Sequence, residues 1–114
     1  MILLVDDDLR ILHATSQLLI KNGFAVVMAD CGAAALATLD ENPSVKTLIT
    51  DVLMPGMKGT ELATFAKARR AGLAVLFISG DIGDSVAADF GGAEVLAKPF
   101  TASALLGALA RTVA

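Results

Sequence analysis

Short apolar runs alternate along the chain with longer segments in which apolar residues recur every three or four positions. Such runs are typical of strands, and such segments of amphipathic helices. The predicted strands are residues 2–6, 24–28, 46–50, 73–78 and 94–97. The predicted helices are residues 9–22, 33–41, 59–71, 84–90 (capped by Asp84) and a last helix capped by Thr101. The pattern therefore predicts five successive βα units.

The predicted strands are apolar at nearly every position, which is typical of a parallel sheet covered by helices on both faces. The helix patterns also predict which side chains face that sheet. These are Ile11, Leu12, Thr15, Leu18, Leu19, Leu62, Phe65, Ala66, Leu106, Leu109, Ala110 and Val113. No linker or low-complexity segment interrupts the alternation, so residues 1–114 are expected to form one domain.

Composition narrows the class of protein. The 114 residues are 55% hydrophobic and 18% charged, with a net charge of -3. An acidic chain offers no basic surface for a nucleic-acid backbone, so no direct nucleic-acid partner is expected. No apolar run reaches the roughly 18 residues that membrane insertion needs, and no leader sequence is visible. Cys31 cannot form an internal disulfide and is expected to be a small buried side chain. We therefore expect a cytoplasmic domain.

Polar residues follow four of the five predicted strands. The pair Asp6-Asp7 follows the first strand, Asp51 the third, Ser79 the fourth and Lys98 the fifth. In an open parallel sheet, ligands bind outside the carboxyl ends of the strands, where the strand order reverses. With strand order 2-1-3-4-5 the first and third strands are neighbours at that point. The three carboxylates should then share one crevice with a hydroxyl and an ammonium.

This set of side chains suits magnesium and phosphoryl chemistry. Two carboxylates 4 Å apart repel by about 4 kcal/mol at an effective dielectric constant of 20. A Mg²⁺ ion, which prefers oxygen ligands, would remove that repulsion. One carboxylate could then attack a phosphorus atom, and Lys98 and Ser79 would contact the phosphoryl oxygens. Each residue alone is weak support, because Asp8, for example, is expected simply to cap a helix. Their joint placement carries the argument.

The chain resembles the receiver domain of response regulators over its whole length, through Leu3–Asp8, Thr50–Met57, Ile78–Gly80 and Ala97–Phe100. The resemblance implies a flavodoxin-like, doubly wound fold with a five-stranded parallel sheet in the order 2-1-3-4-5. It also implies a signalling domain of a two-component system or phosphorelay. Self-phosphorylation and self-dephosphorylation would be its only chemistry, so it is not expected to be an enzyme.

The resemblance also assigns roles to single residues. Asp51 matches the phosphoacceptor, which takes a phosphoryl group from a sensor histidine kinase or a phosphotransfer domain. Asp7 matches the direct Mg²⁺ ligand, and Asp6 acts largely through a bound water molecule. The backbone carbonyl of Leu53 matches the third protein ligand. Ser79 matches the switch hydroxyl, Lys98 the ammonium that pairs with the phosphoryl group, and the Lys98–Pro99 bond a cis peptide.

Three features depart from that family or extend beyond it. The family usually has Tyr or Phe three positions before the lysine, where this chain has Val95, and the segment from Ser79 to Lys98 is short. We therefore expect intact phosphorylation chemistry with an altered output surface. The last helix has no charged residue from 102 to 110. It could present a weakly polar surface, or it could bind a partner or a second copy of the chain.

Other functions fit less well. A degenerate receiver domain would bind a partner without phosphorylation, but this chain keeps Asp51, Lys98 and the other expected site residues. A phosphatase of the haloacid-dehalogenase type would use Asp6 and Asp8, yet its late acidic motif should follow the lysine, and Gly80–Asp84 precedes it. A flavin-binding domain fits least, because the loop after the first strand is acidic and lacks a phosphate cradle.

Overall fold

The computed structural model describes residues 1–80 and 93–113. All five predicted strands are present: β1 (Ile2–Val5), β2 (Val26–Ala29), β3 (Thr47–Asp51), β4 (Ala74–Ser79) and β5 (Glu94–Ala97). The described residues also contain four helices: α1 (Leu9–Lys21), α2 (Gly32–Glu41), α3 (Gly59–Arg69) and α4 (Ala102–Val113). The predicted helix at 84–90 and its Asp84 cap lie outside the described residues.

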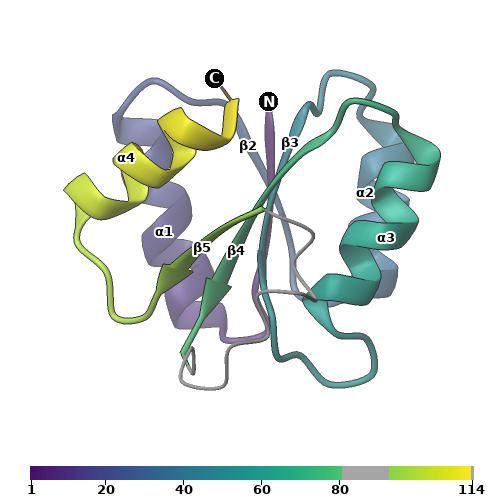
Figure 1. Cartoon of the computed structure of the whole chain (residues 1–114), viewed down its shortest axis with the longest axis horizontal. Helices are drawn as coiled ribbons and strands as arrows, with labels where there is room; N and C mark the ends of the chain where they lie inside the picture. Colours follow the sequence, from purple (N-terminus) through teal and green to yellow (C-terminus); the bar gives the residue numbers. More distant parts are fainter. Residues whose placement is uncertain (81–92, 114) are drawn as a thin grey trace.

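The strands form one parallel sheet in the order β2-β1-β3-β4-β5, which confirms the predicted topology. The register pairs Val5 with Thr50, and Asp51 with Ile78, so the carboxyl ends of the three central strands lie level with one another. Figure 1 shows both chain termini at the opposite end of the sheet. Residues that follow these strands therefore gather at one edge of the molecule.

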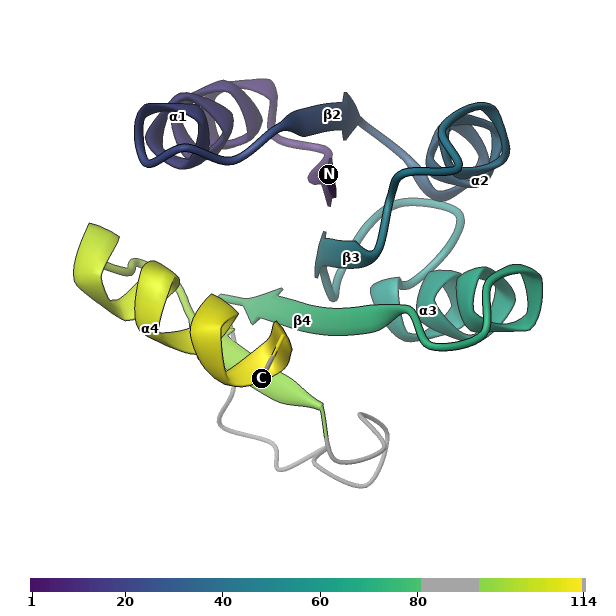
Figure 2. The ribbon, with the colours of Figure 1, turned by 90° about the horizontal axis from the view of Figure 1, so that it is seen from above.

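Helices cover both faces of the sheet, with α1 and α4 on one side and α2 and α3 on the other (Figure 2). Successive side chains of a strand point to opposite faces, so each strand supplies both cores. In β1, Leu3 and Val5 join the core under α2 and α3, while Ile2 and Leu4 join the core under α1 and α4. This two-sided burial explains why the strands are apolar at nearly every position.

Helix ends follow the predicted signals. The Asp8 side chain accepts hydrogen bonds from the backbone N–H groups of Arg10 (3.0 Å) and Ile11 (3.4 Å), which makes it the N-cap of α1. The Thr101 hydroxyl likewise accepts from the N–H of Ala104 at 3.0 Å. Gly23 follows α1 with φ 93°, a left-handed conformation that glycine adopts without steric cost.

Several predicted core positions were wrong. Phe65 is 51% exposed, because α3 packs through the adjacent stripe of Leu62, Ala63 and Ala66. In α4 the buried residues are Leu105, Ala108 and Leu109, whereas Ala110 is exposed and Val113 is 55% exposed. Strand β2 begins at Val26, two residues later than predicted, so Phe24 lies in the preceding loop and is 38% exposed. Cys31 is only half-buried.

Candidate metal centre at the carboxyl edge of the sheet

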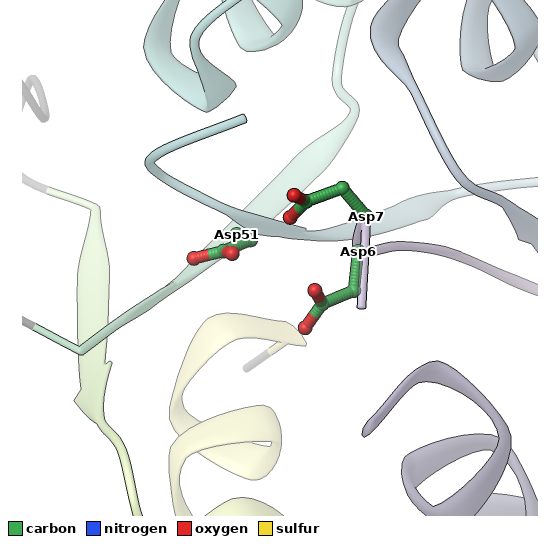
Figure 3. A group of neighbouring side chains, drawn as sticks. All are labelled: Asp6, Asp7 and Asp51. Carbon is green, nitrogen blue, oxygen red and sulfur yellow. The ribbon is translucent and has the colours of Figure 1, made fainter. Parts of the chain in front are cut away.

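Three carboxylates converge where β1 and β3 end. Asp6 and Asp7 directly follow β1, and Asp51 is the last residue of the neighbouring strand β3. Each side chain offers one oxygen atom, and these three atoms lie within 4.8 Å of one another. Figure 3 shows the three side chains as neighbours at the ends of β1 and β3. The structure thus brings together the acidic residues that the sequence predicted.

The two aspartates of the β1 end have different surroundings. Asp6 is 3% exposed, and its Oδ1 accepts a hydrogen bond from the backbone N–H of Asp8 at 2.9 Å. Its Oδ2 accepts a hydrogen bond from the Lys98 ammonium at 3.0 Å. Asp7, in contrast, is exposed to solvent. Asp6 is therefore held rigidly by the protein, while the Asp7 carboxylate is open to an incoming cation.

Lys98 follows β5, and its side chain reaches past the end of β4 to Asp6 and Asp51, at the ends of β1 and β3. Its Nζ lies 3.0 Å from Oδ2 of Asp6 and 3.3 Å from Oδ2 of Asp51. The backbone N–H of Lys98 donates to the carbonyl of Ser79 at 2.8 Å, which extends the β4–β5 ladder to this point. The Lys98–Pro99 bond is cis, as the resemblance implied. The ion pair between Lys98 and Asp6 was not foreseen from the sequence.

The centre carries more negative than positive charge. Burial raises the pKa of Asp51; the Lys98 charge opposes this, but the charge of Asp6 adds to it, and the pKa stays above its ordinary value. Burial alone would lower the pKa of Lys98. The hydrogen bond that Lys98 donates to Asp6 and the charges of Asp51 and Asp6 outweigh that effect and raise the pKa of Lys98. The Lys98 ammonium therefore stays protonated, but its single positive charge does not balance the three carboxylates.

The remaining predicted site residues lie next to this cluster. Ser79 ends β4 and is 3% exposed, and it lies one residue beyond Ile78, the register partner of Asp51. Leu53 lies in the loop between β3 and α3, and its side chain is 61% exposed. The flanking Val52 and Met54 are buried, so the backbone at Leu53 is anchored on both sides.

The donor set fits a divalent cation that prefers oxygen. Asp6, Asp7 and Asp51 offer carboxylate oxygens only, which suits Mg²⁺ better than metals that favour nitrogen or sulfur ligands. A bound cation would also favour the ionised form of Asp51, whose pKa is raised by burial and, to a lesser extent, by the charge of Asp6. The residues present therefore fit the metal site that the sequence predicted.

An apolar groove of about 480 Å³ lies between α1 and the segment that follows β5. It is lined by Ile11, Ala14, Thr15, Leu18, Lys98, Pro99, Phe100 and Ala102. Two of the residues predicted to face the sheet, Ile11 and Leu18, line this groove and are only half-buried. Through Lys98, the groove adjoins the acidic cluster.

Comparison with known proteins identifies the family. Residues 2–110 match the family model of the response regulator receiver domain. The chain belongs to this family. In sequence, the receiver domain is 38% identical over 113 residues to the response regulator protein FleR of Pseudomonas aeruginosa, covering 96% of this chain and 24% of FleR. It is 37% identical over 102 residues to the response regulator receiver protein CpdR of Brucella abortus, covering 87% of this chain and 84% of CpdR.

Solved structures agree with this assignment. The receiver domain superimposes on the chemotaxis protein CheY4 of Vibrio cholerae with a TM-score of 0.91 at 27% identity, covering 97% of this chain and 96% of that one. It also matches the receiver domain of the hybrid histidine kinase CckA, with a TM-score of 0.85 at 30% identity and coverage of 99% and 98%. Among the described residues, no helix is long and apolar enough to cross a membrane.

Proposed function

We propose that residues 1–114 form a single, cytoplasmic receiver domain that accepts a phosphoryl group on Asp51 in a Mg²⁺-dependent reaction. One observation carries this proposal: the oxygens of Asp6, Asp7 and Asp51 lie within 4.8 Å of one another, with the Lys98 ammonium 3.3 Å from Asp51. Membership of the receiver family supports it. The phosphodonor would be the histidine of a sensor kinase or of a phosphotransfer domain.

In this mechanism an Asp51 carboxylate oxygen attacks the phosphorus atom of a phosphohistidine. The new O–P bond forms as the N–P bond breaks, and the electron pair of that bond stays on the imidazole nitrogen. Asp7, Asp51 and the Leu53 carbonyl would hold a Mg²⁺ ion, with Asp6 acting largely through water. When bound, the ion would neutralise charge on the phosphoryl oxygens.

Lys98 supplies the protein's own positive charge at this point. Its ammonium lies beside Asp51 before any phosphoryl group arrives, so it needs little movement to pair with a phosphoryl oxygen. The buried hydroxyl of Ser79, at the end of the adjacent strand, would donate to another phosphoryl oxygen and report phosphorylation to the rest of the domain. Neither residue would turn over a substrate, so the domain acts as a signalling element.

The decisive experiment is mass spectrometry of the protein after incubation with acetyl phosphate and Mg²⁺. We expect a single phosphoryl adduct that is absent in Asp51→Asn and in the presence of a chelator. Asp40→Asn is the matched control, because Asp40 is exposed and pairs only with the exposed Arg69 among the described residues. An adduct that persists in Asp51→Asn would place the phosphoacceptor elsewhere. No adduct in the wild-type protein would favour a degenerate, phosphorylation-independent binding module.

The lengths of the relatives and the surface of α4 bear on which partners the domain binds. FleR is several times longer than this chain, which spans 24% of it, whereas the chain spans 84% of CpdR, so a full-length regulator and a lone receiver are both represented among relatives. In α4, the exposed residues between 102 and 110 are Ala102, Ser103, Ala104 and Ala110. These small side chains form a weakly polar surface, and a partner or homodimer contact through α4 stays a prediction.

Val95 is expected to change how phosphorylation is reported. It lies in β5, half-buried against the core under α2 and α3, and has no ring that could swing toward Ser79. We expect a stable phosphoryl mimic such as beryllofluoride to bind normally but to shift the amide signals of residues 80–95 only weakly. Val95→Tyr should enlarge those shifts. Equally large shifts in the wild-type protein and in Val95→Tyr would contradict this hypothesis.

A further inference from the structure

The loop of residues 52–58 joins Asp51 to α3 and contains Leu53. Two glycines, each the first residue of a different helix, pack closely against this loop. Gly59, the first residue of α3, donates its N–H to the carbonyl of Val52 at 2.8 Å. A Cβ atom on Gly59 would overlap the carbonyl oxygen of Asp51 and lie 3.0 Å from its carbonyl carbon. These are backbone atoms, which cannot rotate away from an added methyl group.

Gly32, the first residue of α2, packs against the same loop at Met57. A Cβ atom on Gly32 would lie 2.5 Å from Sδ, 3.1 Å from Cγ and 2.9 Å from Cβ of Met57. A different Met57 rotamer would move Sδ and Cγ, but Cβ is fixed to the backbone. An alanine at position 32 would therefore push the loop backbone itself, at a point two residues before Gly59.

Close approach, rather than backbone conformation, explains both glycines. Neither has the left-handed φ that is found at Gly23, Gly56 and Gly72. Alanine is a better helix former than glycine, so both positions are intrinsically unfavourable for the helices they begin. Both glycines are buried, and each touches the segment that runs from Asp51 to Met57.

We propose that Gly59 and Gly32 are positioning residues of the metal and phosphoacceptor site. They hold the loop 52–58 so that the Asp51 carboxylate and the Leu53 carbonyl face the same cation, although neither glycine contacts that cation. This inference rests on the proposed function of Asp51. It predicts that filling either contact weakens Mg²⁺ binding and slows phosphorylation of a domain that is still folded.

Gly32→Ala is the main test, because Gly59→Ala presses on backbone atoms and could prevent folding. We expect the dissociation constant of the Gly32→Ala protein for Mg²⁺, from a titration followed by NMR, to rise about tenfold, which corresponds to roughly 1.4 kcal/mol. The rate of phosphorylation by acetyl phosphate at fixed Mg²⁺ should fall with it. In metal-free protein, the amide shifts of residues 51–59 should already differ from the wild type, which reports the loop position without any ligand.

Gly107→Ala is the matched control. Gly107 lies within α4, and a Cβ there would meet nothing closer than the Arg111 guanidinium at 3.6 Å. This variant should keep wild-type Mg²⁺ affinity and wild-type shifts at residues 51–59. Gly59→Ala, where it folds, should lose more affinity than Gly32→Ala.

A double-mutant cycle separates positioning from general destabilisation. Met57→Gly removes Cβ, Cγ and Sδ of residue 57, the three atoms nearest to a Cβ on Gly32, so adding Gly32→Ala to it should change Mg²⁺ affinity no further. An equal loss in both backgrounds would overturn the proposal, as would wild-type affinity and wild-type shifts in Gly32→Ala. A wild-type protein that takes neither Mg²⁺ nor a phosphoryl group would instead overturn the proposed function, and the inference with it.

Discussion

At the residue scale, Lys98 is shared between two carboxylates that belong to different strands. Its ammonium lies 3.0 Å from Asp6 and 3.3 Å from Asp51, and all three side chains are largely shielded from solvent. Burying charged groups is costly unless they are paired, so the two carboxylates depend on the single ammonium of Lys98. The ammonium therefore contributes to the stability of the unliganded domain as well as to its chemistry.

Lys98→Met tests that dependence. The substitution keeps most of the side-chain volume but leaves Asp6 and Asp51 without a cation, so we expect the free energy of unfolding to fall by about 3 kcal/mol without metal. Saturating Mg²⁺ should restore part of the loss. Urea denaturation with and without Mg²⁺ measures both effects. Lys67→Met, at an exposed position of α3, is the control, and equal losses in the two variants would contradict the prediction.

The raised pKa of Asp51 predicts a pH-dependent stability. A carboxyl group whose pKa is higher in the folded than in the unfolded protein stabilises the fold at low pH and loses that contribution as pH rises through the folded pKa. At neutral pH its ionised form therefore costs stability. Asp51→Asn should be more stable than the wild type at neutral pH in the presence of a chelator, and this advantage should vanish below the ordinary Asp range.

Urea denaturation of both proteins over a pH series measures that difference directly. Because the other carboxyl groups titrate in both proteins, their contributions largely cancel in the comparison. A constant difference at all pH values would contradict the raised pKa.

Single residues also show what sequence could predict. Asp6, Asp7 and Asp51 were predicted to converge because parallel strands align their carboxyl ends. Lys98 and Asp6 are 92 positions apart in the sequence, so no local pattern predicts which carboxylate the ammonium will bind. Gly59 and Gly32 were missed for a similar reason. The reason for a glycine at the start of a helix becomes clear only when the atoms that a side chain there would overlap are known.

At the element scale, Arg70, the residue that follows the last turn of α3, links α3 to the carboxyl end of α2. The Arg70 guanidinium donates to the backbone carbonyls of Leu39 (2.9 Å), Asn42 (3.0 Å) and Val45 (2.8 Å). These groups lie at the carboxyl end of α2 and in the turn beyond it, where the carbonyls of Leu39 and Asn42 also accept from the backbone N–H groups of Asn42 and Val45. Arg70 thereby couples two helices that cover the same face of the sheet.

Arg70→Lys should break this contact, because a single ammonium cannot reach three carbonyls as the planar guanidinium does. We expect the free energy of unfolding to fall by roughly 2 kcal/mol. The adjacent Arg69 gives the matched control: it pairs with the exposed Asp40, so Arg69→Lys should cost less than about 0.5 kcal/mol. Thermal or urea denaturation measures both, and equal effects would show that the carbonyl contacts contribute little.

Helix faces were predictable only in part. The stripe of α1 was correct at Leu12, Thr15 and Leu19, where polar residues mark the opposite side clearly. In α3 and α4 the small residues are spread around the helix, so the hydrophobic pattern does not distinguish neighbouring faces. Packing against the sheet then decides the rotation, and it leaves Phe65 outside and Leu105 inside.

At the scale of the whole molecule, metal binding should stabilise the domain because only the folded chain assembles the three carboxylates. At a free Mg²⁺ concentration ten times the dissociation constant, the gain should be roughly 1.4 kcal/mol. We expect this gain in the wild type and in Asp40→Asn, and little of it in Asp7→Asn. Asp7 is exposed, so its replacement should not disturb folding. Denaturation in Mg²⁺ and in a chelator measures the effect, and an equal gain in Asp7→Asn would rule Asp7 out as a ligand.

The parallel sheet was predictable from the repeated βα pattern and the handedness of its connections, whereas the strand order was implied by the resemblance to receiver domains. The same order has a consequence for biosynthesis. Within this domain, β1 is synthesised first but occupies an interior place in the sheet, and its inner neighbour begins only at Thr47. The ammonium that offsets the acidic pair arrives still later, on the final strand. A nascent chain that stops before Lys98 would therefore expose uncompensated charge and an open sheet edge, and the open edge favours pairing with other chains.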